Sequence, residues 1–447
     1  RDRPLDKKQT SGPSSLLTPR IPEFLGAEEY KLREHQRETI HKWMNNEYHG
    51  IFALATGAGK TITAIHASVR VLEAEAKRDR PVCIIVSAPY INLADQWREN
   101  LELFNISSIP CYRSREHWRN RLSNAIAAFN SGASKYLCIV VVNATLASKN
   151  FQEHLKSIPP TSLLWIGDEC HHHGSQRLNQ CLPGAAKYRI GLSATPEHYI
   201  DEEANERLKQ YYGAVVANYS LTDAIEDGVL TPYKYYPNVV TLTDEEGDEY
   251  RTLSHQISNL MATKFSHGKL SEQSESSLNQ LLMRRARLLG SADNKIISLR
   301  KILNGRDIEP HTLFYCGDGS MKDDSDENKF VRQIETISRE LHELGWRTSR
   351  FTSRETSKTK KNILENFRVG SIDAMVAIRC LDEGIDIPAC RTAFLLASAR
   401  NPRQFIQRRG RILRRAPGKE FAVVYDFLVQ LPETEDEENF AAEKNLV

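Results

Sequence analysis

The stretch 53-ALATGAGKTITAIHASV-69 decides how the first half of the chain folds. An apolar run leads into a turn that contains Gly57 and Gly59, and apolar residues at helical spacing follow Lys60. A glycine-rich turn between a strand and a helix directs several backbone N–H groups at one anion, which also meets the positive end of the helix dipole. We therefore predict a phosphate-binding loop made of Thr56, Gly57, Ala58, Gly59, Lys60 and Thr61.

Two residues of this loop have predicted roles. Lys60 is expected to reach the β- and γ-phosphates of a nucleotide, and Thr61 to place its hydroxyl on Mg²⁺. The usual pattern, G-x-x-x-x-G-K-[ST], begins with a glycine, whereas this chain has Leu54 there. Because the Gly-Lys-Thr core is intact between a strand and a helix, the pattern favours a phosphate loop over a plain turn. The predicted cofactors are ATP and Mg²⁺.

A second motif, 163-LLWIGDECHHH-173, supplies carboxylates. Asp168 follows an apolar strand, so its side chain is expected at the carboxyl edge of the sheet, beside the phosphate loop. Asp168 is predicted to hold Mg²⁺ through its water shell, and Glu169 to orient and polarise the attacking water.

The three histidines of this motif could indicate a metal site. On an extended segment they would point alternately to opposite sides, and no cysteine or acidic cluster at zinc spacing accompanies them. We therefore predict no zinc site, and expect His171 to be a polar contact within the ATP site.

Apolar runs recur along the chain and predict an α/β fold. They are apolar throughout rather than alternating, which is typical of strands covered on both faces of a parallel sheet, and helix-like segments separate them. Two series predict two successive doubly wound parallel-sheet domains: residues 50–55, 82–89, 136–144, 163–169 and 188–194, then 312–318, 348–353, 373–379, 392–398 and 421–427.

The predicted boundaries follow from composition. Residues 1–22, rich in Pro, Ser, Lys and Arg, are expected to be disordered, and 433–447 form an acidic tail. Between them lie a first domain at 23–220, a connector and helical element at 221–310, and a second domain at 311–432. Residues 249–303 are predicted as helices, with a loop near 271–277.

Composition narrows the class of protein. No run approaches the roughly 18 consecutive apolar residues that a membrane span needs, so no membrane partner is expected. The eight cysteines form no CxxC pair, which favours a reducing, cytoplasmic location. A net charge of +2 says little about partners.

The ordered motifs resemble those of the superfamily-2 helicases and translocases, in the DExH-type group, over residues 28–428. The matching segments are LREHQ (32–36), ATGAGKT (55–61), SAPYINLADQW (87–97), VVNATL (141–146), DECH (168–171), GLSATP (191–196), FYCGDG (314–319), AIRCLDEGIDIP (377–388) and QFIQRRGRILR (404–414). The resemblance implies two RecA-like domains with a cleft between them that closes on ATP.

The resemblance also implies residue roles at the ATP site. Arg33 and Gln36 would contact adenine, and Gly384 and Asp386 would face the ribose and phosphates. Gln407 would lie near the γ-phosphate or the attacking water, while Arg411 and Arg414 would act as arginine fingers that stabilise transition-state charge.

Further residues are implied for a nucleic-acid track, which would contact mainly phosphates. They are Pro89, Asn143, Ala144, Thr145, Gly317, Thr352, Arg379 and Cys380, while Ser193 and Thr195 would couple the two sites. The basic residues of 281–303 either flank a duplex or are solvated charges on an amphipathic helix: Arg284, Arg285, Arg287, Lys295, Arg300 and Lys301.

The leading hypothesis is an ATP-dependent translocase or helicase acting on DNA, resembling helicases of bacterial restriction and phage defence. Defence-complex partner proteins are expected, and cleavage would need a partner or a missing nuclease domain, since no nuclease signature is apparent. Two alternatives remain open: an RNA helicase or duplex-RNA-activated ATPase, and an ATP-gated DNA clamp that does not move.

Overall fold

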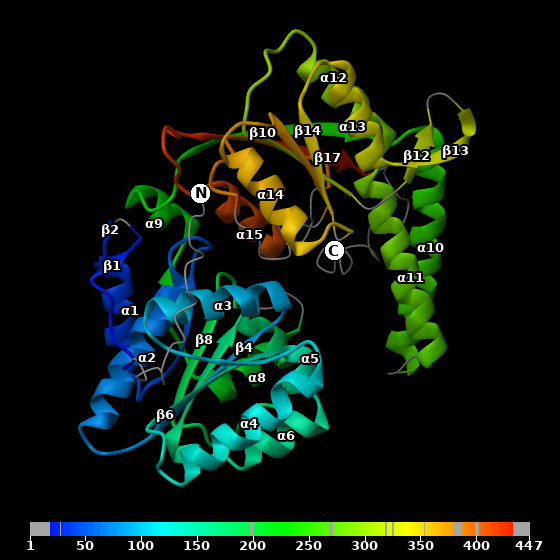
Figure 1. Cartoon of the computed structure of the whole chain (residues 1–447). Coiled ribbons are helices and arrows are strands. Elements are labelled where there is room, and N and C mark those ends of the chain that lie inside the picture. Colours follow the sequence, from blue (N-terminus) through cyan, green and yellow to red (C-terminus); the bar gives the residue numbers. More distant parts are fainter. Residues whose placement is uncertain are drawn as a thin grey trace, which may run out of the picture. The chain divides into compact units, whose positions relative to one another are not determined.

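The computed structural model describes residues 18–26, 28–196, 201–267, 271–317, 320–323, 326–352, 354–378, 387–397 and 402–431. The chain forms two compact units that meet in sequence between Tyr219 and Ser220, and Ala55–Ala58 group with the second unit. Each unit is built on its own parallel sheet (Figure 1), which confirms the predicted α/β fold with two parallel-sheet domains.

The first unit contains a seven-stranded sheet in the order β5-β6-β4-β7-β8-β3-β9, with every neighbouring pair parallel. Five strands match the predicted apolar runs: β3 (His49–Leu54), β4 (Val82–Ala88), β6 (Tyr136–Val142), β7 (Leu163–Asp168) and β8 (Tyr188–Ser193). The two edge strands are β5 (Ile109–Cys111) and β9 (Val215–Tyr219). All seven residues of β4 are buried, as the continuous apolar run predicts for a central strand.

Helices alternate with these strands. The longer ones are α1 (Glu34–Asn45), α2 (Lys60–Ala76), α3 (Ile91–Leu103), α4 (Arg115–Asn130), α6 (Lys149–Lys156) and α8 (Glu202–Tyr212). Shorter elements are α5 (Asn143–Leu146), α7 (Gln176–Asn179), the 3-10 helices η1 (Pro160–Ser162) and η2 (Cys170–Gly174), and the antiparallel pair β1 (Phe24–Leu25) and β2 (Glu28–Glu29). The core of this unit buries large aromatic rings, including Trp165 and Tyr212.

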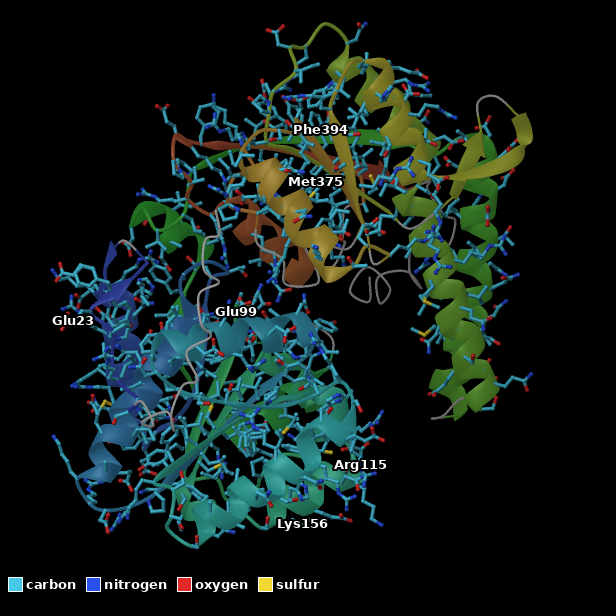
Figure 2. All side chains as sticks on the ribbon, viewed as in Figure 1. Glu23, Glu99, Arg115, Lys156, Met375 and Phe394 are labelled. Atoms are coloured by element: carbon cyan, nitrogen blue, oxygen red, sulfur yellow. The ribbon has the colours of Figure 1, made fainter. Side chains whose placement is uncertain are left out.

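The second unit contains a six-stranded parallel sheet in the order β10-β17-β16-β11-β15-β14. Its strands are β10 (Tyr233–Thr241), β11 (Thr312–Cys316), β14 (Thr348–Phe351), β15 (Ala374–Ile378), β16 (Thr392–Leu395) and β17 (Ala422–Gln430). The rings of Phe314, Phe394 and Tyr425 stack across three neighbouring strands, with centroids 4.8 Å apart in each pair. Figure 2 shows Phe394 and Met375 within this sheet, and both side chains are buried.

The helices of this unit are α9 (Leu221–Glu226), α10 (Asp244–His267), α11 (Glu272–Gly290), α12 (Asp293–Leu303), α13 (Gln333–Glu343), α14 (Ser357–Arg368) and α15 (Pro402–Ile412). The antiparallel pair β12 (Ser320–Asp323) and β13 (Asp326–Arg332) precedes α13. Helices α10 and α11 lie side by side (Figure 1). Among the described residues, no helix is both long and apolar enough to cross a membrane.

Two local predictions are wrong, those of a loop near 271–277 and of an extended histidine run, and two other regions are divided more finely than predicted. The loop expected near 271–277 is mostly the start of α11, where the Ser271 hydroxyl accepts a hydrogen bond from the Ser274 N–H and caps the helix. The segment 281–303 is two helices that separate at Ser291 and Ala292. The region 221–310, predicted as a connector and helical element, contains helices α9 to α12 and also β10, which pairs with β17 along nine residues. The histidine run lies on η2 rather than on an extended segment.

Candidate ATP and nucleic-acid sites

The predicted phosphate loop lies where expected, between β3 and α2. Gly57 and Gly59 have φ of 92° and 89°, which only glycine adopts readily. The Ala58 N–H donates to the Ala55 carbonyl at 3.0 Å and closes the turn, while Thr56 and Ala58 are buried. Gly59 is the N-cap of α2, and no side chain caps this end. The first N–H groups of α2, including those of Lys60 and Thr61, therefore suit a phosphate.

The Lys60 ammonium donates to the Leu54 carbonyl at 3.1 Å. This bond folds the side chain back over the loop, where a triphosphate would meet its charge. The acceptor is a backbone carbonyl, which every residue has. Leu54 can therefore make this contact in place of the leading glycine of the usual pattern.

Gln36 supports the loop from α1. Its side chain is 4% exposed, and its Nε2 donates to the Thr63 hydroxyl at 3.0 Å and to the Gly59 carbonyl at 3.4 Å. Its Oε1 accepts from the N–H of Arg33, the N-cap residue of α1, at 2.9 Å. Both ends of the amide are therefore bonded within the protein, and the adenine contact assigned to Gln36 and Arg33 stays a prediction.

We expect Gly59→Ala to weaken ATP binding more than tenfold. A Cβ at Gly59 would lie 2.5 Å from Gln36 Nε2, so the side chain that supports the loop must move. Titration of a fluorescent ATP analogue measures the effect. Gly132→Ala is the matched control, because Gly132 has φ of 79° but nothing within 4 Å of a Cβ. Both variants should lose about 1–2 kcal/mol of folding free energy through backbone strain. Equal ATP affinity in the two variants would contradict the prediction.

Asp168 ends β7 and is 6% exposed. Its Oδ2 accepts from the Trp97 indole N–H at 2.8 Å, and its Oδ1 accepts from the Glu169 N–H at 3.1 Å. Burial and then the neighbouring Glu169 carboxylate raise the pKa of Asp168 to about 6, while the Trp97 bond and the Lys60 charge lower it. Two adjacent carboxyl groups, one of them buried, fit a divalent cation, whose charge would favour the ionised form.

Trp97 contacts Asp168, although the sequence motifs gave it no role at this site. Its apolar, helically spaced neighbours in α3 made it look like ordinary core. The signal was its place at the end of the segment 87–97, one of the matched motifs.

We expect Trp97→Phe to weaken Mg²⁺ binding to the ATP complex by about 10–100-fold, the usual range for a lost outer-shell partner of a metal ligand. The phenylalanine ring fills most of the space but leaves Asp168 Oδ2 without its donor. The Mg²⁺ dependence of ATP turnover measures the change. Trp43→Phe is the control, because its indole N–H donates at 2.9 Å to the Arg189 carbonyl, outside the site. A normal Mg²⁺ dependence in Trp97→Phe would refute the role.

Glu169 has an unusual backbone. Its φ is 44° and ψ is 53°, a left-handed conformation that costs a non-glycine residue about 1–2 kcal/mol. Helix η2 follows it directly, and His171 Nδ1 lies 3.4 Å from Glu169 Oε2 and 3.3 Å from the Ser193 hydroxyl. The structure therefore brings His171, Glu169 and Ser193 together, while the roles of His171 in the ATP site and of Ser193 in coupling stay predictions. The Ser193 hydroxyl also accepts from the Thr195 N–H at 3.2 Å, an ordinary turn contact.

The predicted nucleic-acid residues of the first unit lie near the carboxyl ends of β4 and β6. Pro89 follows β4 and is half-buried. Helix α5 begins at Asn143, and Ala144 is exposed and Thr145 half-buried. The Asn143 side chain is itself buried, and its Oδ1 accepts from the Ser87 hydroxyl at 2.8 Å.

In the second unit, Gln407 and Arg411 lie on α15, half-buried and buried respectively, and Arg414 pairs with Leu230 just after that helix. Their neighbours attach the helix to the unit: Arg408 donates to the Ala397 carbonyl at 2.7 Å, and Arg409 lies over the Tyr235 ring at 4.2 Å. The Gly317 N–H donates to Gln333 and the Thr352 hydroxyl to Glu355. Arg379, Cys380, Gly384 and Asp386 lie outside the described residues.

Most of the basic residues of 281–303 are held by the protein itself. Arg285 and Lys295 are buried, and Arg285 donates to the Ser254 hydroxyl at 3.2 Å while Lys295 donates to the Leu396 carbonyl at 2.5 Å. Arg284 pairs with Glu249, and Arg300 with Glu340. These contacts favour a structural role over a duplex-binding surface.

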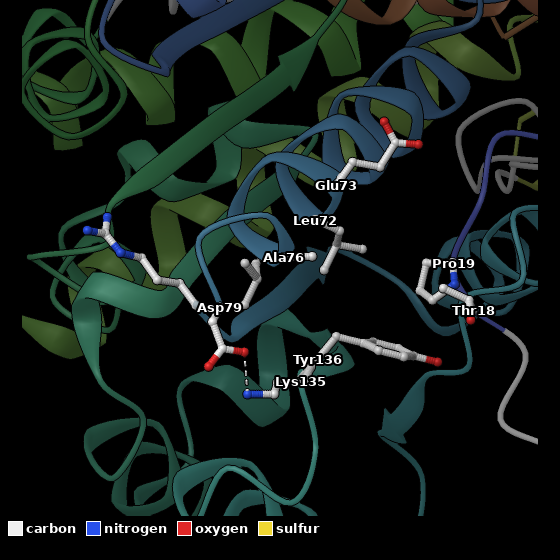
Figure 3. Close-up of a pocket in the computed structure, with 10 residues that line it drawn as sticks. Thr18, Pro19, Leu72, Glu73, Ala76, Asp79, Lys135 and Tyr136 are labelled. Carbon is white, nitrogen blue, oxygen red and sulfur yellow. Dashed lines mark hydrogen bonds and ion pairs between the residues drawn. The ribbon is translucent and has the colours of Figure 1, made fainter.

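A cavity of about 240 Å³ in the first unit lies away from these residues. It is lined by the starts of β4 and β6 and the end of α2, including Leu72, Val82 and Tyr136 (Figure 3). Because the strands are parallel, this is the opposite edge of the sheet from Asp168. The cavity contains none of the predicted ATP or nucleic-acid residues.

The comparisons with known proteins agree with these motifs. Residues 29–198 match the family model "Type III restriction enzyme, res subunit", and residues 319–416 match "Helicase conserved C-terminal domain". The chain is 25% identical over 408 residues to "DNA 3'-5' translocase XPB2" of Sulfurisphaera tokodaii, covering 88% of this chain and 81% of that protein.

A second relative, "Putative DNA 3'-5' helicase Rad25" of Haloarcula marismortui, is 24% identical over 389 residues, or 86% of this chain; the chain spans about half (51%) of that protein's length. Among solved structures, the fold resembles the type ISP restriction-modification enzyme LlaBIII bound to DNA. The TM-score is 0.57 and the identity 18%, over 94% of this chain and 29% of that one. The chain therefore belongs to the superfamily-2 helicases and translocases, a class of ATP-dependent enzymes.

Proposed function

We propose that this chain couples hydrolysis of Mg-ATP to movement along, or remodelling of, DNA. The observation that carries the proposal is the carboxylate pair Asp168 and Glu169 at the carboxyl edge of the first sheet, with the Lys60 charge acting on Asp168 and His171 linking Glu169 to Ser193. DNA is favoured over RNA because the relatives that match most of this chain are named as DNA translocases and helicases.

The proposed roles follow from the chemistry of each group. The phosphate loop binds the triphosphate through its backbone N–H groups and Lys60. Mg²⁺, held by Thr61 and Asp168, would neutralise charge on the β- and γ-phosphate oxygens. Glu169 accepts a proton from the attacking water, and His171 orients this carboxylate. Gln407, Arg411 and Arg414 are assigned to the γ-phosphate and its transition-state charge by the motif alone.

The proposal extends to a role in restriction or phage defence. The match of residues 29–198 to the res subunit of type III restriction enzymes supports it. Nuclease activity would then come from a partner protein or from a domain outside this sequence.

Two experiments test the function. ATPase rates are measured with single- and double-stranded DNA and with single- and double-stranded RNA, and we expect DNA to give the larger stimulation. Larger stimulation by RNA would favour an RNA helicase instead. Displacement of the third strand from a DNA triplex then tests movement, because a clamp that only binds DNA would release nothing with ATP.

A further inference from the structure

A buried network of polar side chains lies in the first unit, next to η2. It consists of Ser87, Asn143, Trp165, His173 and Tyr212, and we call it the His173 network. His173, Tyr212, Trp165 and Ser87 are each 0% exposed. Buried polar groups of this kind are retained only where they are hydrogen-bonded, and a fully satisfied network fixes one arrangement of the segments that it joins.

The hydrogen bonds run continuously through the network. The Trp165 indole N–H donates to Tyr212 Oη at 3.0 Å, and Tyr212 Oη lies 2.7 Å from His173 Nδ1. His173 Nε2 lies 3.3 Å from Asn143 Oδ1, which also accepts from the Ser87 hydroxyl at 2.8 Å.

One set of donor and acceptor roles satisfies all these contacts. Burial lowers the pKa of His173 to about 3, so the ring is neutral and carries one N–H. Asn143 Oδ1 can only accept, so the proton lies on His173 Nε2. His173 Nδ1 then accepts from the Tyr212 hydroxyl, whose oxygen accepts from Trp165. The network is therefore directional, and each bond depends on the next.

Strand β7 is shaped to admit the network. A Cβ on Gly167 would lie 2.0 Å from Tyr212 Oη and 2.9 Å from the His173 ring. Only glycine at this position leaves room for the Tyr212–His173 bond, one residue before Asp168.

Members of the network belong to different parts of the proposed machinery. Ser87 is two residues before Pro89, and Asn143 begins the helix that carries Ala144 and Thr145. His173, in the middle of the network, lies on η2, which follows the strained Glu169 directly. The network thus ties the segments assigned to nucleic acid to the segment that orients the water-activating carboxylate.

We propose that His173 is a positioning residue that transmits nucleic-acid binding at Pro89 and residues 143–145 to the alignment of Glu169. This inference rests on the proposed function. Nucleic acid that shifts α5 moves Asn143 Oδ1, and His173 passes the shift to η2 and so to Glu169. The route is separate from the contact of His171 with Ser193.

The test compares ATP turnover with and without a blunt-ended DNA duplex in two variants. His173→Phe keeps an aromatic ring and removes every hydrogen bond of the imidazole, whereas Tyr212→Phe removes only the hydroxyl that bonds His173 Nδ1. We expect stimulation by DNA to fall at least tenfold in His173→Phe and at least threefold in Tyr212→Phe. The unstimulated rate, KM for ATP and Kd for the duplex should change less than threefold.

Tyr211→Phe is the matched control, because its hydroxyl donates to the Pro183 carbonyl at 3.1 Å from the same helix but outside the network. Urea unfolding checks that each variant is folded. If His173→Phe does not fold, Tyr212→Phe alone tests the proposal. Normal stimulation in a folded variant, or an equal fall in stimulated and unstimulated rates, overturns the positioning role. A wild-type ATPase that DNA and RNA both fail to stimulate overturns the proposed function and this inference together.

Discussion

Lys60→Ala is expected to lower kcat/KM for ATP by about 10³-fold, the upper end of the range for removing one preorganised donor aimed at the reacting group. This corresponds to about 4 kcal/mol of transition-state stabilisation. Alanine removes the ammonium that now donates to Leu54 and would meet the β- and γ-phosphates. It also removes a positive charge that lowers the pKa of Asp168, so Asp168 should ionise at a higher pH than in wild type. Steady-state ATPase assays across ATP concentrations and pH measure both effects.

Lys135→Ala is the matched control for Lys60→Ala. Its ammonium pairs with Asp79 at 2.8 Å at the cavity shown in Figure 3, away from the phosphate loop. The exposed pair contributes little stability, so turnover should stay within twofold of wild type. Near-normal turnover in Lys60→Ala would refute the assignment of residues 56–61 as the phosphate loop.

The central strands could be predicted from sequence because they are buried on both faces. The runs that form β3, β4, β6, β7 and β8 are apolar at nearly every position, which no solvent-facing strand would be. The missed strands lie at sheet edges. Strand β5 (Ile109–Cys111) has three residues, one of them Pro110, and β9 (Val215–Tyr219) mixes exposed and buried positions. Edge strands bury less surface, so their sequences resemble loops.

The site was predictable where a motif fixes the chemistry and not where tertiary packing does. Glycine spacing and the Asp-Glu pair located the loop and the carboxylates. Nothing in the sequence showed that Gln36 would brace Gly59, or that Lys419 would be buried. The Lys419 ammonium donates to the Pro388 and Arg414 carbonyls at 3.1 and 2.9 Å, and burial lowers its pKa to about 8. A lysine in a polar stretch is usually solvated, so only the fold reveals that it anchors the end of α15.

The positions of basic residues in the sequence did not show which of their side chains are buried. The six basic residues of 281–303 were expected to flank a duplex or to be solvated, yet Arg285 and Lys295 are buried. Periodicity did not separate α11 from α12, because Ser291 and Ala292 interrupt the apolar pattern only briefly. A buried arginine bonded to Ser254 and a solvated one are identical in sequence.

Glu169→Gln is expected to lower kcat by about 10²–10⁴-fold, the range that a general base contributes, while ATP binding is retained. The amide keeps the size of the side chain, so the strained turn into η2 and the contact with His171 can persist. What is lost is the group that accepts the proton from water. Single-turnover hydrolysis and ATP-analogue titration separate these two effects.

Asp168→Asn is the variant to compare with Glu169→Gln. Each removes one carboxylate charge, but the two should differ in their effect on Mg²⁺ binding. In Glu169→Gln, the lost charge attracts Mg²⁺ less but also lets Asp168 ionise more readily, so the two effects oppose each other and Mg²⁺ binding should change less than in Asp168→Asn. In Asp168→Asn, the buried ligand itself loses its charge, so Mg²⁺ binding should weaken and excess Mg²⁺ should restore part of the rate. A Glu169→Gln protein that high Mg²⁺ rescues would place Glu169 among the metal ligands, and one that hydrolyses ATP at the normal rate would remove it from catalysis.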